Sequence, residues 1–447
     1  MSLLSYLKGK YDDVAERLDE SSKDVREDIS EVVSRGLSTV REDLDGLTAK
    51  LKGLAFEHTD EIFAILRRIR PIVVHKDVAI ITRFDDVQEV LALGDVFQTL
   101  YEPKLQAVSG RGAVGGPNTA EYMRDASLMR LTFRREDIEA RIAAPTLERA
   151  AAIVDAAEGT FDLVADLAGV LPLQVIGEYI GLPDPQPGQL ACWAESIFRY
   201  VFGDINDDPA VSEPSLAAAA EFAAHVDATI AARKLDRRDD SDVLGRLLRL
   251  QELGQPGADD LSIRSTLMIY VYGTATLMAR SAALALDELF RHPEALAKAQ
   301  RAARAGELDT VRAYVWEALR LNPINPGLFR RATEDYRLSQ GNRRVTLIPK
   351  GTLVFASLAS AMVDSFELDD ATSIRVDRPD YHYMHFGHGL HECFGRFVSQ
   401  AMLPRLLIPV LARADLRRAE GDAGELEISD GFYPRHLRVE FGPSCAS

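Results

Sequence analysis

The sequence predicts a mainly α-helical protein with small β-sheets, organised as one large fold that follows an N-terminal helical segment. Residues 118–305 are rich in Ala and Leu and are interrupted only by loops containing Pro and Gly, which is typical of a helical body. Short apolar runs lie at 72–82 and again after residue 322, where prolines, glycines and charged residues separate them as in small sheets. We find no internal repeat and no linker, so residues 56–447 are expected to form a single domain.

The first 55 residues have a different pattern, which predicts an amphipathic helical extension over residues 1–55. Apolar residues recur there at alternating spacings of four and three, the spacing of a heptad seam. Three interpretations remain open: a helix or hairpin packed on its own body, self-association through residues 25–55, or a helix on a membrane surface. The seam contains Leu and Val but no Trp, which disfavours the membrane. Its members are Val33, Leu37, Val40, Leu44, Leu47, Leu51 and Leu54.

Within the main domain, Ile72–Val74 and Val78–Thr82 flank a charged turn and predict a β-hairpin. The longest helix is expected from about Ser262 to Phe290, where the sequence is apolar around most of the helix and stops before Pro293. This helix should therefore be central and buried. After it we expect strands at Val345–Ile348 and Leu353–Ala356, a last helix over about Cys393–Arg413, and terminal strands within 425–441.

Charge and cysteine content restrict the class of protein. The 447 residues include 52 Lys and Arg against 69 Asp and Glu, a formal charge of −17, which argues against nucleic acid as the main partner. The three cysteines, Cys192, Cys393 and Cys445, are far apart and odd in number, which excludes a disulfide framework and fits a reducing compartment. No stretch is apolar enough for a signal peptide or a transmembrane segment, so we expect a cytoplasmic protein.

The most informative stretch is Phe386-Gly-His-Gly-Leu-His-Glu-Cys-Phe-Gly395, a Gly-rich loop that delivers Cys393 to the start of a helix. Backbone N–H groups and the positive end of the helix stabilise a thiolate there, and the thiolate is the form that binds metal. Glycines at 387, 389 and 395 allow tight turns and close approach to a flat cofactor. The spacing is too specific for a buried structural cysteine.

This stretch resembles the haem-binding loop of the cytochrome P-450 superfamily, Phe-Gly-x-Gly-x-His-x-Cys-x-Gly, and matches it at every fixed position, including Phe386, Gly387 and Gly395. The resemblance implies haem b (iron protoporphyrin IX) as the cofactor, with Cys393 as the proximal iron ligand. It also implies that His391 contacts a haem propionate. The resemblance covers roughly residues 60–441.

Three further matches occur in the order typical of the family. Glu317-Ala-Leu-Arg320 matches its Glu-x-x-Arg signature, which implies a structural ion-pair network completed by a later arginine, here Arg378. Phe329-Arg-Arg-Ala-Thr333 is similar to a family strand whose arginine binds a propionate, which implies Arg330, with Arg331 as the rival. Residues 81–91 look like the early hairpin and following helix of the family.

The sequence departs from the family in the long central helix, at Tyr272-Gly-Thr-Ala-Thr276. The usual pattern there is Ala-Gly-x-Asp/Glu-Thr, whose acid and alcohol shape a proton supply. Gly273 is kept, Thr276 occupies the alcohol position, and Ala275 replaces the acid. Thr274 is an alternative hydroxyl, and a lone threonine inside a helix can instead bond its own backbone.

A second departure lies at Glu121-Tyr-Met-Arg-Asp-Ala-Ser127, where many members have a histidine and an arginine that meet the propionates. Tyr122 replaces the histidine and Ala126 the arginine. The hydroxyl of Tyr122 could donate to a propionate. Arg124 is a possible substitute for the missing cation, although helical geometry puts it on another face.

The resemblance implies a monooxygenase that inserts one oxygen atom from O2 into a hydrophobic organic substrate, with electrons from a ferredoxin and its reductase. A basic surface near Cys393 would receive the donor, formed by Arg130, Arg134, Arg135, Arg396 and Arg405. Ala275 keeps open a peroxygenase or fatty-acid hydroperoxide isomerase that needs no electron donor. A haem-binding protein without turnover is a third possibility. Several apolar residues could either line a hydrophobic substrate pocket or belong to the protein core. They are Phe97, Trp193, Phe198, Phe202, Leu328 and Phe329.

Overall fold

The computed structural model describes residues 59–442 apart from 112–114, 158, 205–206, 237–240 and 430–431. The predicted extension over residues 1–55, with its possible self-association, lies outside the described residues, as does Cys445. The assignment of residues 56–447 to one domain therefore stays a prediction at its boundaries.

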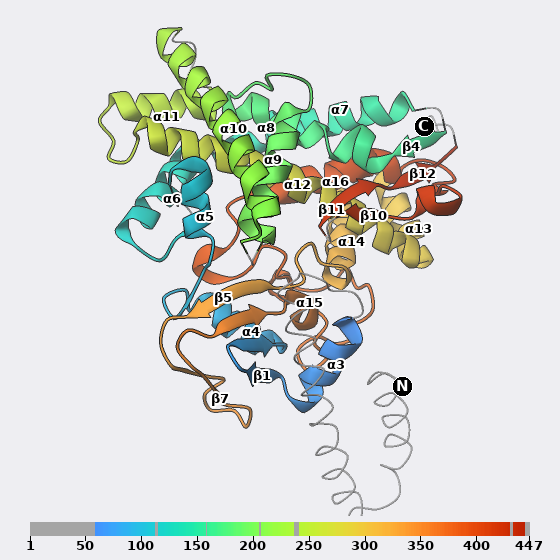
Figure 1. The fold of residues 1–447 in the computed structure, drawn as a ribbon. Helices are drawn as coiled ribbons and strands as arrows, with labels where there is room; N and C mark the ends of the chain where they lie inside the picture. The colour runs from blue at the N-terminus through green and yellow to red at the C-terminus, as the bar shows by residue number, and fades with distance from the viewer. Residues whose placement is uncertain are drawn as a thin grey trace, which may run out of the picture.

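Helices make up most of the described chain, as the sequence predicts, and gather in the upper part of Figure 1. Short π-helical turns extend several of them. The α-helices are α3 Thr59–Ile69, α4 Phe84–Ala92, α5 Glu102–Ser109, α6 Ala120–Thr132, α7 Ala144–Asp155, α8 Leu171–Ile180, α9 Gln189–Phe198, α10 Pro209–Leu235, α11 Val243–Glu252, α12 Asp260–Arg291, α13 Pro293–Arg304, α14 Leu308–Leu321, α15 Leu358–Ala361 and α16 Arg396–Leu411.

The largest sheet is five-stranded, with the order β1-β2-β8-β5-β3, and lies in the lower part of Figure 1. The predicted hairpin forms its edge, with Ile72 opposite Ile81, and β8 lies parallel to β2. Three smaller sheets have the orders β4-β12-β9, β10-β11 and β6-β7. The strands are β1 Ile72–His75, β2 Val78–Ile81, β3 Phe97–Gln98, β4 Thr160–Asp162, β5 Leu328–Ala332, β6 Tyr336–Leu338, β7 Thr346–Ile348, β8 Leu353–Ala356, β9 Arg417–Arg418, β10 Glu427–Ser429, β11 Tyr433–His436 and β12 Arg438–Glu440.

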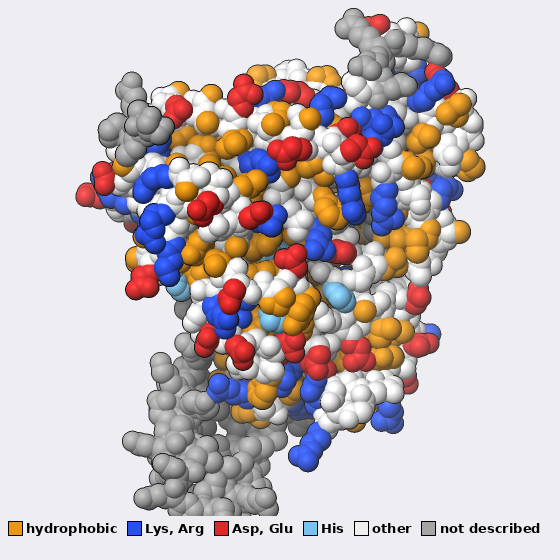
Figure 2. Space-filling view, turned by 180° about the vertical axis from the view of Figure 1, so that it is seen from behind, with side chains coloured by type: hydrophobic (Ala, Val, Ile, Leu, Met, Phe, Trp, Pro, Cys, Tyr) orange, Lys and Arg blue, Asp and Glu red, His pale blue; other side chains and the backbone are white. Residues whose placement is uncertain are grey.

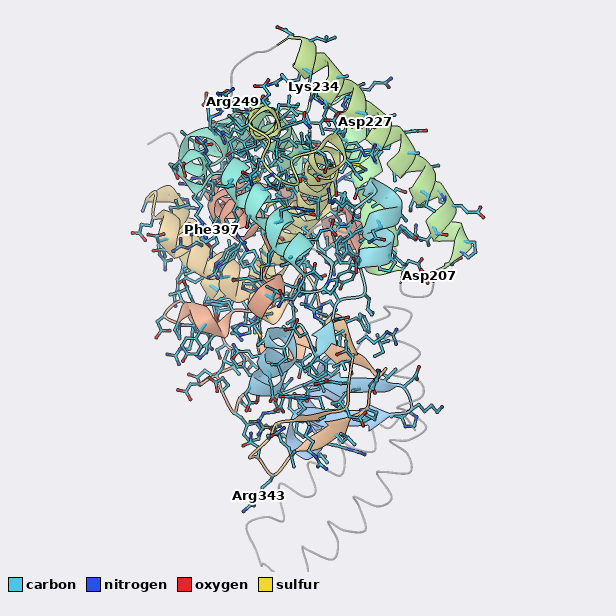
Figure 3. The ribbon with its side chains drawn as sticks, turned by 90° about the vertical axis from the view of Figure 1, so that its left-hand side faces the viewer. Asp207, Asp227, Lys234, Arg249, Arg343 and Phe397 are labelled. Atoms are coloured by element: carbon cyan, nitrogen blue, oxygen red, sulfur yellow. The ribbon has the colours of Figure 1, made fainter. Side chains whose placement is uncertain are left out.

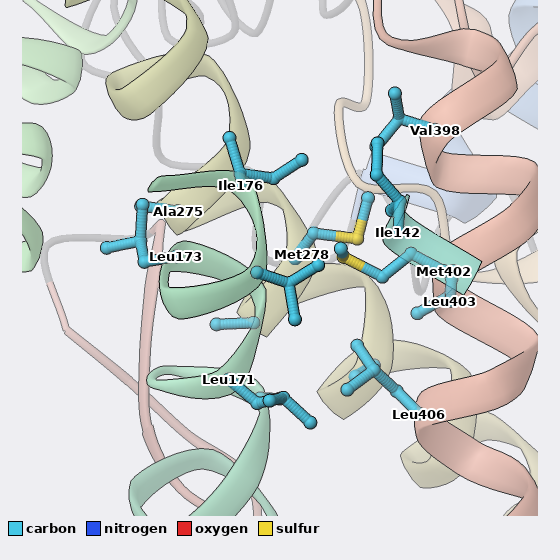
Figure 4. Close-up of a cluster of buried hydrophobic side chains, with 14 of the residues drawn as sticks. Ile142, Leu171, Leu173, Ile176, Ala275, Met278, Val398, Met402, Leu403 and Leu406 are labelled. Carbon is cyan, nitrogen blue, oxygen red and sulfur yellow. The ribbon is translucent and has the colours of Figure 1, made fainter. Parts of the chain in front are cut away.

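The central helix predicted from the apolar run is α12, which is 32 residues long. It begins after Asp259, whose carboxylate accepts a hydrogen bond from the N–H of Ser262 at 2.8 Å, and it ends before Pro293. Helices α8, α9, α10, α14 and α16 pack around it, so the long apolar surface is buried. Figure 4 shows part of this core, where Ala275 and Met278 of α12 lie among side chains of neighbouring helices, including Leu171, Leu173, Ile176, Met402, Leu403 and Leu406.

The last helix, α16, is shorter than predicted at both ends and begins at Arg396 rather than Cys393. The reason lies in the loop before it, where the N–H of Cys393 donates to the carbonyl of Phe386 at 2.8 Å instead of entering a helical ladder. The first turn of the helix forms only after Gly395, whose carbonyl accepts from the N–H of Ser399 at 2.9 Å. Cys393 therefore precedes the helix instead of belonging to it.

Among the described residues, the stretch Leu163–Ile180 has the length and mean hydropathy of a membrane span, but 67% of it is buried inside the protein. It includes α8, which packs against α12 as part of the core.

On the face drawn in Figure 2, basic and acidic side chains are interspersed with apolar ones.

A buried ion-pair network fixes the chain that leads to Cys393. Glu317 of α14 accepts two hydrogen bonds from Arg320, at 2.8 and 2.9 Å, and one from Arg378 at 3.2 Å. It also accepts from the hydroxyl of Tyr383 at 3.0 Å. Desolvation alone would raise the pKa of Glu317, but the hydrogen bonds and charge of Arg320, then the N–H of Arg375, outweigh it and lower the pKa. The predicted role of Arg378 as the third member is confirmed by this geometry.

We expect Glu317→Gln to lower the free energy of unfolding by about 3–5 kcal/mol, because it leaves two buried guanidinium groups without their counter-charge. Urea denaturation at pH 7 measures this loss. Since the pKa of Glu317 is lowered in the folded state, its contribution is complete above the unfolded-state pKa of about 4.3 and disappears as the pH falls through the folded-state value. Arg312→Gln, which breaks an exposed pair on the same helix, is the control and should change little. Equal losses for the two variants would contradict the role assigned to Glu317.

Candidate functional site

A cavity of about 1260 Å³ lies between α12, the segment after α14, the start of β5 and the loop that carries Cys393. Ordinary small-molecule pockets measure about 300–1,000 Å³, so this cavity has room for a cofactor and a further ligand. Its walls are mainly apolar, and the polar groups among them come from a few elements. Phe198, Phe202, Leu328 and Phe329 line it, whereas Phe97 and Trp193 belong to the core.

The loop Phe386–Gly395 forms one wall of the cavity. Gly389 has a φ of 76°, and a Cβ there would come within 2.8 Å of the backbone of α4 at Ala92 and Leu91. Glycine at this position therefore lets the loop lie directly against α4. Gly387 also has a positive φ of 74°, which turns the chain beneath the cavity. Phe386 packs edge-on against Trp316 of α14, with ring centroids 6.0 Å apart.

Cys393 is exposed, and its exposed surface is part of the cavity wall. Desolvation by the enclosing protein raises the pKa of the Cys393 thiol. The negative charge of Glu392 raises this pKa further, whereas a hydrogen bond from the N–H of Gly395 lowers it. A positively charged metal ion bound at the sulfur would reverse the balance and favour the thiolate.

The wall formed by α12 differs from the sequence prediction. Gly273, Thr274 and Leu277 line the cavity and are partly exposed, whereas Thr276 is buried and is not part of the wall. The helical repeat does not account for this, because Thr276 follows Gly273 by three residues and so lies toward the same side of α12. Thr276 is kept from the wall because the surrounding protein covers it. Of the two threonines predicted for this site, Thr274 is therefore the one on the cavity wall, and the catalytic role of either hydroxyl stays a prediction. Ala275, at the acid position, packs in the core (Figure 4).

Arg330 lies on β5 with its side chain directed into the cavity, and only 3% of it is exposed. Its Nη1 donates to the carbonyl of Phe329 at 2.8 Å, while its buried Nε has no hydrogen-bond partner among the described residues. Desolvation lowers the pKa of Arg330, opposed by the neighbouring Tyr101. Arg331, the rival, is exposed and donates to the carbonyl of Gly351. Strand alternation decides between the two arginines.

Tyr122 connects α6 to the cysteine loop. Its hydroxyl donates to the carbonyl of Leu390 at 3.0 Å, and its ring lies edge-on to His391 with centroids 5.3 Å apart. Both residues line the cavity. Arg124 does not, because it points to the other side of α6 and pairs with Asp125 at 2.9 Å and Glu121 at 3.2 Å. Arg124 therefore does not replace the missing cation.

The donor set around this cavity fits haem b. The thiol of Cys393 and the α12 residue Gly273 both line this cavity. A Cβ added at Gly273 would meet nothing within 4 Å, so a flat group has open space beside this part of α12. Arg330 is a buried cation without a carboxylate partner among the described residues, which suits the negative propionate groups of haem. His391 belongs to the cysteine loop, and the ring of Tyr122 lies edge-on to it while the Tyr122 hydroxyl bonds to the same loop.

Comparisons with known proteins find the same family that the cysteine loop resembles. The family model described as Cytochrome P450 matches residues 216–428. Cyclomarin C epoxidase CymV of Salinispora arenicola is 28% identical over 67% of this chain and 72% of its own length. The cytochrome P450 monooxygenase PikC of Streptomyces venezuelae is 29% identical over 64% of this chain and 63% of its own length.

Solved structures share the fold. The open form of cytochrome P450 Eryk from S. erythraea has a TM-score of 0.74 at 23% identity, covering 88% of this chain and 98% of that one. P450BioI in complex with an acyl carrier protein has a TM-score of 0.75 at 19% identity, covering 88% of this chain and 100% of that one.

The fold and the cysteine loop are those of a haem-thiolate oxidoreductase, and the chain is similar to cytochrome P450 proteins in both sequence and fold. It is a monooxygenase with haem b as its cofactor.

Two cavity residues were missed or misplaced by sequence reasoning. Arg280 lines the cavity two turns after Gly273 on α12, and the helical repeat from Gly273 through Leu277 could have identified it. Arg130, expected only on the docking surface, is exposed and also lines the cavity one turn after Ala126 on α6.

We expect Arg330→Met to increase the rate of haem loss by about tenfold or more, because a hydrogen bond to a charged group contributes about 1.5–3 kcal/mol. Transfer of haem to excess apomyoglobin, followed by absorbance, measures this rate. Arg331→Met, on the adjacent outward-facing position, should leave the rate unchanged. Equal rates in both variants and the unmodified protein would show that Arg330 does not hold the cofactor.

Proposed function

We propose that this enzyme inserts one oxygen atom from O2 into a small hydrophobic organic compound in the cytoplasm, with electrons delivered by a separate ferredoxin and ferredoxin reductase. The main support is the cavity itself, which faces a thiol on one side and a largely apolar wall on the other. Two relatives are named a steroid C26-monooxygenase and an erythromycin C-12 hydroxylase, which supports oxidation of an organic substrate. The exposed free thiol of Cys192 suits a reducing compartment.

In this proposal Cys393 is the iron ligand, and the backbone of Phe386, Gly387 and Gly395 shapes the loop around its sulfur. Bound haem supplies the iron at which dioxygen is activated. Arg330 and His391 would hold the propionates. Tyr122, whose single hydroxyl hydrogen is donated to the carbonyl of Leu390, would support this side of the cofactor by tying the loop to α6. A buried guanidinium is well suited to this task because its charge is weakly screened inside the protein.

On the opposite wall, Gly273 leaves space for the cofactor and Thr274 presents a hydroxyl to the cavity. A hydroxyl both donates and accepts hydrogen bonds, so Thr274 can orient a water or pass a proton toward the reacting oxygen. We therefore assign the alcohol function to Thr274 in preference to Thr276.

The electron donor would dock beside the cysteine loop, where α6 is followed by a short 3-10 helix, η2 (Arg135–Asp137). We name this surface the α6–η2 patch, and it consists of Arg130, Arg134 and Arg135. These arginines are exposed, and no carboxylate partner is found for them among the described residues. Arg135 lies over the ring of Phe397, labelled in Figure 3, at 3.6 Å from its centroid. Arg396 and Arg405 contribute less net charge, since they pair with Glu392 and Glu139. Local potential rather than the total of −17 decides such docking.

The reduced protein with carbon monoxide should give the absorption band of a haem thiolate, and Cys393→Ser should abolish it. Turnover with a ferredoxin and reductase is then compared with turnover on peroxide alone. Product in the first reaction supports the proposal. Product only with peroxide would favour the redox-partner-independent alternative that Ala275 keeps open, and a thiolate band with no product in either reaction would favour a non-catalytic haem protein.

We expect Thr274→Ala to lower the product formed per electron pair by about 2–10-fold, the effect of losing one hydrogen bond near the reacting oxygen. Thr276→Ala is the matched control and should leave this ratio unchanged. The ratio is measured from NADPH consumed and product formed. A loss confined to the Thr276 variant would return the alcohol role to that residue.

A further inference from the structure

Arg280 is a buried arginine of α12 that the monooxygenase reaction described above does not use. Only 7% of it is exposed, and it lines the cavity. Its Nε donates to the carbonyl of Ile324 at 2.8 Å, and its Nη1 donates to the carbonyl of Phe432. These two bonds leave Nη2 for a further acceptor.

No acid balances the charge of Arg280 in the part of the chain that the structure describes. Of the six buried arginines among the described residues, four pair with a carboxylate: Arg246 with Asp137, Arg320 and Arg378 with Glu317, and Arg413 with Asp155. The two without one are Arg330 and Arg280, and both line the cavity. Burial lowers the pKa of Arg280 to about 10, with the neighbouring Tyr433 opposing the shift. A buried cation of this kind is costly unless an anion joins it.

The surroundings of Arg280 suggest which molecule supplies the anion. Its guanidinium lies over the ring of Phe432, 4.4 Å from the centroid. Phe432 stacks on Phe198 at 5.1 Å, and Phe198 contacts Phe202 at 4.7 Å, so an aromatic wall continues from the cation. All three aromatic residues line the cavity.

The position along α12 sets a distance between the two ends of a bound molecule. Arg280 follows Gly273 by seven residues on the same helix, which corresponds to about 10 Å along the axis. An extended apolar chain can therefore place its far end near Gly273 and Thr274 while its polar end lies at Arg280.

We propose that Arg280 binds the carboxylate of an apolar organic acid and so orients this substrate in the cavity. This assignment rests on the proposed function, because it specifies the hydrophobic substrate of the same site. Arg330 serves the cofactor and Arg280 the substrate. A guanidinium suits this task, since its fixed N–H groups match a carboxylate.

The test is equilibrium binding to the oxidised haem-loaded protein, followed by the haem absorption spectrum, without electrons or O2. The probes are decanoate and 1-decanol, which share a chain length and differ in charge. We expect decanoate to bind about tenfold more tightly or better, as a hydrogen bond to a charged group would give. Arg280→Gln should remove this preference and leave the affinity for 1-decanol within about twofold, while Arg280→Lys should keep part of it.

Arg264→Gln is the matched control, because Arg264 lies on α12, pairs with Asp227 and is not part of the cavity wall. It should retain the full preference for decanoate. Equal affinity of the unmodified protein for the two probes would overturn the proposal, and so would a preference that survives in Arg280→Gln. If that variant does not fold, the unmodified protein and Arg280→Lys still decide. Since binding needs no turnover, a failure of the monooxygenase proposal would appear separately, in the ferredoxin reaction.

Discussion

The buried carboxylate of Glu317 is the interaction on which the site depends. It joins Arg320 within α14 to Arg378 and Tyr383 in the chain that leads to the cysteine loop. The adjacent Trp316 packs against His385 and Phe386, so α14 supports the base of the loop through both charge and ring contacts. Because both charges are removed from water, neither partner can leave without a large loss in stability. The position of Cys393 is therefore set by groups that take no part in the chemistry.

The distribution of buried charge separates structural arginines from ligand-binding ones. Apart from Arg330 and Arg280, the buried arginines of the described chain are neutralised by Asp or Glu, and most of their pairs connect distant elements, as Arg413, just after α16, pairs with Asp155 of α7. Arg330 and Arg280 line the cavity and have no such partner among the described residues, which is why we propose that they bind ligands. The net charge of −17 does not show which buried arginines are paired. The effect of a charge inside a protein depends on the charged and polar groups within a few ångströms of it.

The central helix shows how packing decides chemistry within one short sequence. Thr274, Ala275 and Thr276 are consecutive, but only Thr274 belongs to the cavity wall, while Ala275 contributes to the core around Leu173. Rotation of a helix by a fraction of a turn exchanges these roles. That rotation is determined by contacts with α8, α9, α14 and α16 along the whole helix, so no local motif specifies it.

Local sequence determined a large part of this protein. The Gly-rich loop with Cys393, the apolar run of α12 and the hairpin at 72–82 are encoded by neighbouring residues, through turn chemistry and periodicity, and each was predicted close to its observed bounds. Very short strands such as β3 and β9 were not predicted, because two residues carry no pattern and pair only through partners far along the chain. Tertiary structure alone decided that Arg330 and not Arg331 enters the cavity, that Thr274 and not Thr276 lies on its wall, and that Arg280 has no acid partner within the described part of the chain. The physical reason is that burial and charge pairing depend on the elements packed around a residue, and those elements come from distant parts of the sequence.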